Sequence, residues 1–593
     1  MRNDRKIPIV VGVTGHRNIV EEDKPSIRAQ VIESLKEIQS LCRCKDGTDT
    51  PVIMLNAFAQ GADMLCAEAA FELGIDVYAV LPCDEERYIK SFDDEQAKGR
   101  LSGYLAKCKR KFVAPDTEKN REWLKAADNM DDDSYEYRQL GIYVAEHSHV
   151  LIALWDGKPP RQQYGCGTVE VIKFALEGKF LDKDHLFKPA MINDSAVVWI
   201  KSRRQGDGDK ADVCRKWLTS KLAADDNTEI YDDYCVSDTP PAFLKDMIDK
   251  TAGYNSQTVE VSDDEVKLWK NIAELDDYRK NLRYHYAKAD NLSYNKNQTK
   301  YNLFVLLLAI IGTVVACTFL IYDDAGLNFM IFPCTAAIGL IIWLTVYGNK
   351  KAYQQNYIQY RALAEALRIQ FYMSMCLSGQ DALPNVCELY SWSQKADMIW
   401  IDKAVRTLAV ISETGKPGVD PSDVVEVWIG NSEKPKGQLK YHNDKKAGNK
   451  RQAEKYERLS KLSLIATVFV YFLIFAAEVA SYVVKSCGKT WFWENNVFGD
   501  VSWRAFAAII LGIATAASLL FSSYWGKLSF DRKADDNEKM SKFYASAYAR
   551  WQEVKKFGGV ETEKFIREVA REEIVENGVW CSYVNENRLE INI

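Results

Sequence analysis

Four apolar runs in the second half of the chain restrict its possible folds more than any other feature. They are residues 303–322, 327–347, 462–484 and 505–524, and Glu478 is the one charged residue within them. Each run has about 20 residues, which as a helix spans a hydrocarbon core of about 30 Å. The alternative is a set of core helices in a large soluble domain, but such helices are usually shorter and polar on one face. The sequence therefore predicts four transmembrane helices.

The four runs form two pairs, so we expect two helical hairpins flanked by further helices. The loops within the hairpins hold only three basic residues, Lys485, Lys489 and Arg504, whereas Lys and Arg are frequent outside both pairs. The positive-inside rule then predicts that both termini and the segment between the hairpins face the cytoplasm.

The predicted organisation has five parts. They are a nucleotide-binding domain at 1–205, a connector at 206–259, a first membrane module at 260–411, a linker at 412–449 and a second membrane module at 450–593. Three motifs flank the hairpins: AKADNLSYN before the first, YRALAEALR after it and REEIVENGVW near the end of the second. This arrangement resembles two copies of SLATT domains, which are two-helix membrane modules found with bacterial nucleotide-signalling systems. The resemblance implies a bacterial inner-membrane protein.

Residues 7–205 alternate short apolar runs with helical patterns. Continuous apolar strands between helices are typical of a parallel sheet covered on both faces, which predicts a Rossmann-like α/β domain. Such sheets bind ligands at the carboxyl ends of their strands. The fold class is therefore an α/β domain followed by an all-α membrane region with cytoplasmic flanking helices.

Polar and glycine-rich turns follow the predicted strands at these ends. Glycine allows a ligand to approach the backbone, the amides of a helix start favour phosphate, and Arg17 would add a bidentate contact. Ordinary turn chemistry is the alternative for any one turn, but four of them would meet at one edge. The candidate ligand-binding residues are Thr14, Gly15, His16, Arg17, Gln60, Gly61, Asp63, Asp156, Gly157, Gly165, Gly167, Thr168 and Glu170.

The ordered motifs VGVTGHR, FAQGADMLCAEAA, AVLPCD with Phe92 downstream, LIALWDG and GCGTVE resemble the SLOG superfamily. That superfamily includes phosphoribohydrolases of the LOG type and sensor domains such as those of Thoeris defence proteins, which bind ADP-ribose-derived signals. LOG hydrolases continue GTxxE with a catalytic glutamate, where this chain has Val171 and places Glu170 one position early. The resemblance therefore implies binding in preference to hydrolysis, and we expect no catalytic residue.

Several candidate residues have simpler interpretations that the sequence leaves open. Glu170 and Asp63 are also well placed to stabilise a helix start, and His16 to hydrogen-bond within its own loop. Glu478, a candidate for the pore or gate, would alternatively reach Arg504 or outer water. Gly512, the second such candidate, lies in a stripe of small residues that more commonly serves helix packing.

Composition gives no support to several other functions. The chain has 77 Lys plus Arg and 83 Asp plus Glu, so its charge gives no reason to expect a nucleic-acid partner. Its 14 cysteines include no CxxC pair, and its six histidines form no ligand motif with them. We therefore expect reduced thiols, no metal and no resident cofactor.

These expectations combine into one functional hypothesis. A nucleotide second messenger, either ADP-ribose-derived or a cyclic nucleotide, binds the SLOG-like domain, and the hairpins of a homo-oligomer then permeabilise the membrane in antiphage defence. The messenger implies an upstream synthase as functional partner, and the lipid bilayer is the other partner. A membrane-tethered nucleotide or NAD-processing hydrolase is the alternative, and a membrane scaffold with a degenerate pocket is a third interpretation.

Overall fold

A computed structural model of the chain divides into two compact units. Unit 1 comprises Met1–Lys288, Ala362–Val419 and Ile566–Val579, and unit 2 comprises Ala289–Arg361, Asp420–Phe565 and Trp580–Ile593. The structure describes residues 5–43, 47, 49–92, 94–115, 121–122, 131–159, 166–178, 195–206, 213–221, 229–231, 234–261, 266, 268–324, 328–377, 386–391, 394, 398–415, 418–430, 437–498 and 501–586, with the backbone alone at 229–231, 324, 498 and 520–528.

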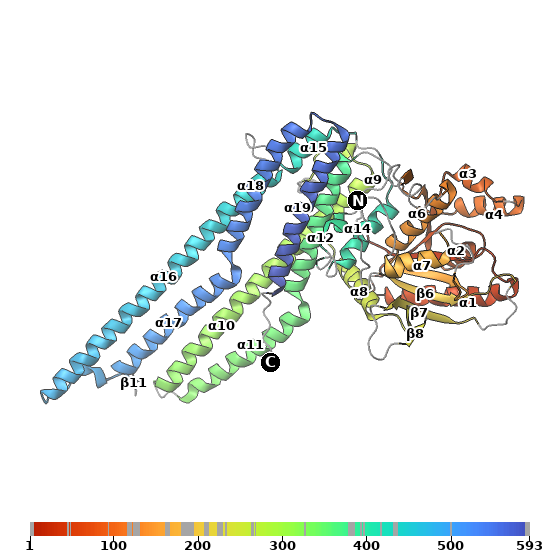
Figure 1. Cartoon of the computed structure of the whole chain (residues 1–593). Helices are drawn as coiled ribbons and strands as arrows, with labels where there is room; N and C mark the ends of the chain where they lie inside the picture. Colours follow the sequence, from red (N-terminus) through yellow and green to blue (C-terminus); the bar gives the residue numbers. More distant parts are fainter. Residues whose placement is uncertain are drawn as a thin grey trace. The chain divides into compact units, whose positions relative to one another are not determined.

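Unit 1 is built on a mixed sheet (Figure 1). Its strand order is β4-β3-β2-β1-β5-β6-β7-β9-β8. The first six strands in this order are parallel, and β7, β9 and β8 continue the sheet antiparallel. The strands are β1 (Ile9–Gly15), β2 (Val52–Asn56), β3 (Asp76–Leu81), β4 (Arg110–Val113), β5 (Val150–Trp155), β6 (Ala196–Lys201), β7 (Arg215–Ser220), β8 (Glu229–Tyr231) and β9 (Tyr234–Ser237). The predicted α/β domain with a parallel sheet is thus confirmed, with an antiparallel extension.

Helices cover the sheet because its central strands are apolar on both faces. One face forms a core with α6 (Asp132–His147) and α7 (Thr168–Glu177), while α1 (Lys24–Leu41) and α2 (Ala62–Glu72) contact each other and the strands. Every residue of β5 is buried, as a strand covered on both faces requires. Two short helices, α3 (Glu85–Lys90) and α4 (Glu95–Leu105), lie in the chain between β3 and β4.

Two segments predicted as connections contain regular structure. Residues 206–259, predicted as a connector, contain β7, β8, β9 and α8 (Ala242–Ser256). Residues 412–449, predicted as a linker, contain α15 (Pro421–Trp428) and the start of α16 (Gly437–Ser486). Strands at the end of a sheet and surface helices need only one apolar face, so their sequences are harder to distinguish from irregular chain.

Helix α14 (Ile399–Ile411) joins the core of unit 1 although it lies far along the chain from the sheet. Its Lys403 Nζ donates to the carbonyl oxygens of Glu146 at 3.1 Å and Ser148 at 2.9 Å. Arg406, 6% exposed, forms ion pairs with Asp402 at 3.0 Å, Glu146 at 3.2 Å and Glu388 at 2.9 Å. These contacts fix α14 to the end of α6 and the chain entering β5.

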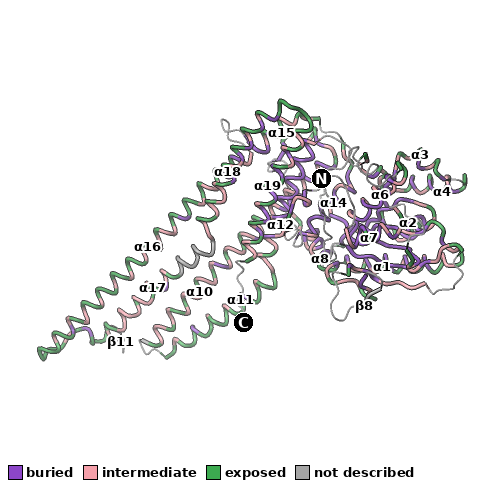
Figure 2. The backbone as a smooth tube through the Cα atoms, in the orientation of Figure 1, coloured by how far each residue is buried: buried purple, intermediate pink, exposed green. Residues whose placement is uncertain are grey.

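Unit 2 contains long helices whose apolar side chains are largely uncovered (Figure 2). Exposed examples are Phe332 at 74%, Phe469 at 62% and Tyr482 at 80%. The long helices of this part of the chain are α9 (Asp277–Asn291), α10 (Thr299–Asp324), α11 (Ile331–Lys351), α12 (Tyr353–Cys376), α16, α17 (Trp503–Leu528), α18 (Phe530–Val554) and α19 (Gly559–Glu586). The division between the units falls within α9, α12 and α19.

Three helical stretches are long and apolar enough to cross a membrane, namely Asp277–Asp323, Asn328–Cys376 and Gly437–Ser486. They include three of the four predicted runs and are compatible with a membrane location. The described apolar stretch of α17 is shorter, Trp503–Leu519. The fourth transmembrane helix therefore stays a prediction.

Replacing Arg406 by leucine should destabilise unit 1 strongly. The change leaves the carboxylates of Asp402, Glu146 and Glu388 without their buried partner, which typically costs about 3–5 kcal/mol. Denaturant unfolding of the full chain in detergent measures the loss. Arg550→Leu removes an exposed pair with Glu553 and is the control, with an expected loss under about 1 kcal/mol. Equal losses in the two variants would contradict this assignment.

Candidate functional site

The predicted ligand residues gather at the carboxyl edge of the parallel strands. Strands β1 and β5 are neighbours, with β2 on the other side of β1, so the chain connections diverge between β1 and β5. In open α/β sheets this divergence leaves a crevice outside the strand ends, where ligands bind. The turns after β1 and β5 and the start of α7 meet here. Thr14 lies buried at the end of β1, beside this crevice.

His16 connects three of these elements. Its Nε2 accepts from the backbone N–H of Asp156 at 3.2 Å, and its Nδ1 lies 3.4 Å from Thr168 Oγ1. Arg204 Nε lies 3.1 Å from His16 Nε2 and 2.9 Å from Asp156 Oδ2. His16 is 7% exposed, so its buried ring links the chain segments that border the crevice. This geometry favours the loop-bonding interpretation, and its contact with a ligand stays a prediction.

Gly61 is required by the close approach of two turns. Its φ is +83°, and a Cβ at this position would lie 2.2 Å from the carbonyl oxygen of Arg17 and 2.7 Å from that of His16. The backbone N–H of Ala62 donates to His16 O at 3.2 Å, which joins the start of α2 to the turn after β1. Gly15 is equally confined, because a Cβ there would lie 2.4 Å from the Cβ of Ala62.

Asp63 is a buried carboxyl in the first turn of α2. Its Oδ2 accepts from the backbone N–H of Ala59 at 3.2 Å, so it stabilises the preceding turn, while Gly61 is the N-cap residue. Burial raises the pKa of Asp63 to about 7, against smaller lowering effects of the Ala59 hydrogen bond and of Arg17. A carboxyl that titrates near neutral pH within a crevice is typical of functional sites.

The start of α7 holds the two positions at which this chain differs from LOG hydrolases, the acidic Glu170 and the apolar Val171. Glu170 Oε2 accepts from the backbone N–H of Gly167 at 3.0 Å, so the carboxylate stabilises the helix start. Val171 is 7% exposed and packs in the core with the sheet. The side chain at the hydrolase position thus points away from the crevice. Gly165 lies outside the described residues.

Arg17 is exposed at the crevice with its guanidinium 5.2 Å from the ring centroid of Tyr137. No hydrogen bond or ion pair of Arg17 occurs among the described residues, so its charge is available to an anion. Gln60 is exposed, and Gly157 has a φ of +78° in the turn after β5. The part of the chain described here holds no group of three or more His, Cys, Asp or Glu side chains able to bind a metal.

The membrane-side candidates both make contacts within unit 2. Glu478 Oε1 lies 2.7 Å from Arg504 Nε and accepts from Trp493 Nε1 at 3.2 Å, as the alternative interpretation requires. Gly512 packs against α10, since a Cβ there would lie 2.2 Å from Leu320 Cδ1. These contacts favour helix pairing for both residues, and their part in gating stays a prediction.

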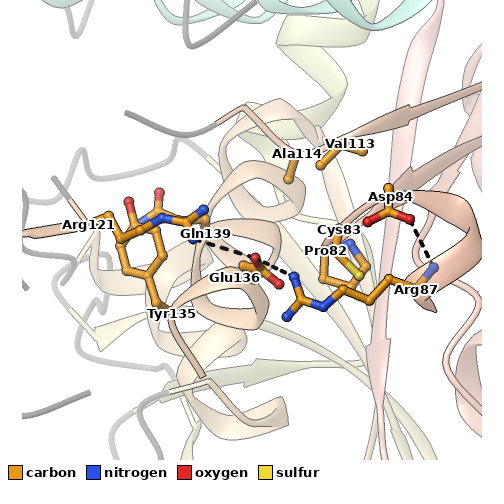
Figure 3. A pocket seen from close by; sticks show the side chains of 10 residues that line it. All are labelled: Pro82, Cys83, Asp84, Arg87, Val113, Ala114, Arg121, Tyr135, Glu136 and Gln139. Atoms are coloured by element: carbon orange, nitrogen blue, oxygen red, sulfur yellow. Dashed lines mark hydrogen bonds and ion pairs between the residues drawn. The ribbon is translucent and has the colours of Figure 1, made fainter. Parts of the chain in front are cut away.

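Sequence reasoning missed several residues at this edge. Arg204 follows β6 and reaches His16 and Asp156 across the sheet. A separate pocket of about 220 Å³ lies beyond β3 and β4, lined by residues that include Arg87, Glu136 and Gln139 (Figure 3). No local motif marks these side chains, because their proximity depends on how α6 packs on the sheet.

Gly61→Ala should destabilise the site far more than Gly74→Ala. Both glycines have positive φ, +83° and +68°, but nothing lies within 4 Å of a Cβ at Gly74. Gly74→Ala should therefore cost about 1 kcal/mol of backbone strain, whereas Gly61→Ala adds a backbone clash and should cost more than about 3 kcal/mol. Thermal unfolding of both variants measures the difference, and similar melting temperatures would contradict the close approach.

The Asp63 carboxyl should make stability depend on pH. Because its folded pKa of about 7 exceeds the unfolded value, the folded state binds more protons between about pH 4 and pH 7. Its contribution to stability therefore falls as pH rises, by up to about 1.4 kcal/mol per pH unit. Asp63→Asn should remove that component. The free energy of unfolding of the wild type minus that of the variant, measured across this pH range, therefore gives the slope. Parallel profiles would show that Asp63 titrates normally.

Comparisons with known proteins identify one family match. Residues 285–380 match the family described as "Protein of unknown function (DUF4231)". This range begins within α9 and contains α10, α11 and α12, which are the first predicted hairpin and its flanking helices. No curated protein matches the chain.

Proposed function

We propose that this protein is a membrane effector gated by a nucleotide-derived second messenger. The messenger, an ADP-ribose derivative or a cyclic nucleotide, binds at the crevice between β1 and β5. The helices of unit 2 then permeabilise a bacterial inner membrane, which stops growth in antiphage defence. The active form is a homo-oligomer, and a separate synthase supplies the messenger.

The observation that carries this proposal is the convergence of four chain turns at one sheet edge, with Arg17 exposed beside them. Gly61 brings two turns into backbone contact, and Gly167 opens α7 toward the same edge. Backbone amides at a helix start and a guanidinium without a carboxylate partner among the described residues both favour a phosphate. The SLOG resemblance supports a nucleotide as the group that bears this phosphate.

The membrane half of the proposal rests on the apolar helices. Three stretches are long enough to cross a bilayer, and their large apolar side chains are exposed. Such uncovered surface requires lipid or other helices. We propose α17 as the fourth transmembrane helix, with both termini in the cytoplasm by the positive-inside rule. The SLATT resemblance of both hairpins supports their role as the effector.

A membrane-tethered hydrolase remains the second candidate because of Asp63. A carboxyl with a pKa near 7 suits general acid or base chemistry. Against this, Glu170 bonds to Gly167 and Val171 is buried, so neither supplies the glutamate of the LOG hydrolases. Chromatography of ADP-ribose and NAD after incubation with the protein distinguishes the two functions, since the effector leaves both intact.

Arg17→Ala should weaken ligand-dependent leakage from liposomes. Purified full-length protein is reconstituted in vesicles loaded with a self-quenched dye, and ADP-ribose and cyclic nucleotides are added outside. The wild type should release dye with one of these ligands, and the variant should need at least about tenfold more, since it loses a charged hydrogen bond to phosphate. Arg100→Ala, an exposed arginine on α4, should behave as wild type.

Two results would overturn the proposal. Tight ligand binding by the wild type without dye release at any ligand concentration would remove the effector function. Release of dye that is the same with and without ligand, and unchanged by Arg17→Ala, would remove the gating function.

A further inference from the structure

Helix α16 carries a cluster of basic residues directly before its apolar run. Residues 445–461 include seven Lys or Arg and two Glu, and the apolar run begins at residue 462. Because α16 is one continuous helix, the basic segment and the apolar run share one axis. Clusters of about four to eight basic residues beside a transmembrane helix are typical of segments that bind anionic lipids. The segment therefore holds more positive charge than its own carboxylates can neutralise.

Three of these residues form one stripe along the helix. At about 100° per residue, Arg451, Lys455 and Arg458 lie within an arc of about 60° around the axis of α16. All three side chains are exposed. Tyr456, about 100° or more around the helix from them, stacks on Phe530 of α18. The three residues, called the basic stripe below, therefore lie on a face that α18 does not cover.

The basic stripe differs from a neighbouring lysine in its contacts. Lys461, the last residue before the apolar run, pairs with Glu457 at 2.5 Å. No ion pair or hydrogen bond occupies the three cations of the stripe within the described part of the chain, and Lys455 Nζ lies 5.8 Å from the ring centroid of Tyr456. Their charges are thus available to an anion.

A pocket of about 310 Å³ lies against the basic stripe. Its described lining consists of the stripe together with Glu454 and Leu459. Three cations and one carboxylate give this lining a net charge of +2. Guanidinium groups match the geometry of a phosphate, with which they form paired hydrogen bonds. The pocket is therefore suited to a phosphate group.

The same face of α16 continues into the apolar run. The exposed side chains of Leu462, Ile465 and Phe469 lie within about 40° of Arg451 around the helix axis. Arg458 is four residues before Leu462, which is about 6 Å along the axis. That distance falls within a headgroup layer about 5–8 Å deep on each side of the hydrocarbon core. A ligand for the whole face needs a phosphate next to an apolar chain, which a phospholipid has and a nucleotide lacks.

We propose that the basic stripe binds the phosphate of an anionic phospholipid in the cytoplasmic leaflet, with the lipid's acyl chains along the exposed apolar side chains of the same face. The inference rests on the membrane part of the proposed function and adds a specific headgroup. Arg458 donates to the phosphate, while Lys455 and Arg451, about 10 and 16 Å before the run, attract it through their charge. A zwitterionic headgroup carries its own cation beside the phosphate, so its net attraction to the stripe is small.

Native mass spectrometry of the full-length protein in detergent tests this assignment. The protein is incubated with equal amounts of phosphatidylglycerol and phosphatidylcholine that carry the same acyl chains, and the retained lipids are counted. The wild type should prefer phosphatidylglycerol. Arg458→Gln should reduce this preference about fivefold, which corresponds to about 1 kcal/mol for a basic residue near an anionic surface. Lys455→Gln should reduce it less and Arg451→Gln least, because screening increases with distance from the headgroup layer.

Lys440→Gln is the matched control. Lys440 is an exposed lysine of the same helix, about 33 Å before the apolar run and thus several Debye lengths from the headgroups. Its replacement should leave the preference unchanged. Equal losses in Lys440→Gln and Lys455→Gln would overturn the site, since only total charge would then matter. Melting temperatures equal to that of the wild type would show that a lost preference does not reflect unfolding.

Glycerol phosphate, which has the phosphate without acyl chains, distinguishes a lipid site from a site for free phosphate. It should not displace phosphatidylglycerol, and displacement at the concentration of the lipid would overturn the lipid assignment. Equal retention of both lipids by the wild type would overturn the headgroup site alone. Retention of neither lipid would remove the membrane crossing of α16 together with this inference. No nucleotide is added in these measurements, so a failure of nucleotide gating is detected separately by dye release.

Discussion

The buried charge of Arg406 constrains the arrangement of unit 1. A guanidinium that is 6% exposed is tolerated only with carboxylate partners, and these come from α14 itself, from α6 and from Glu388. Lys403 adds hydrogen bonds to the chain that enters β5, and Arg110, the first residue of β4, donates to the carbonyl oxygens of Ala409 and Val410. Helix α14 is therefore held at the amino edge of the parallel strands, which leaves the carboxyl edge for the crevice and the pocket.

Helix α6 connects these two edges. It has 16 residues and is about 24 Å long, with Glu136 and Tyr137 near the carboxyl edge and Glu146 at the ion cluster. Because a buried charge without a partner is costly, a shift of α6 requires either movement of α14 or the loss of a buried ion pair of Arg406. A ligand that draws the first half of α6 toward the sheet would thus act on α14, and α14 follows the first hairpin in the chain. This gives the proposed gating a physical path within unit 1.

The sequence predicts the strands of the sheet where burial is complete and fails where it is partial. Strand β5 is apolar throughout and is found from its composition alone. Strand β4 reads Arg110, Lys111, Phe112, Val113 and alternates partly buried with exposed side chains, because it lies at the end of the sheet. The sequence does not predict strands β7 and β9 for a related reason, since an antiparallel extension requires apolar residues on one face only. Long apolar helices are found more readily, because about 20 consecutive apolar residues form a pattern that is distinct from that of a surface helix.

At the candidate site, the sequence predicts the turns but not the side chains that reach them from elsewhere in the chain. A glycine beside a strand is visible locally, whereas Arg204, Glu136 and Gln139 reach their positions through long-range packing that no spacing reveals. Even the glycines are ambiguous on sequence, since Gly61 and Gly74 both have positive φ and border the same helix. Only the space around each distinguishes them: Gly61 faces two carbonyl groups, and nothing lies within 4 Å of a Cβ at Gly74. A glycine therefore marks a site when backbone from a second turn occupies the place of its side chain, because substitution then separates the two turns.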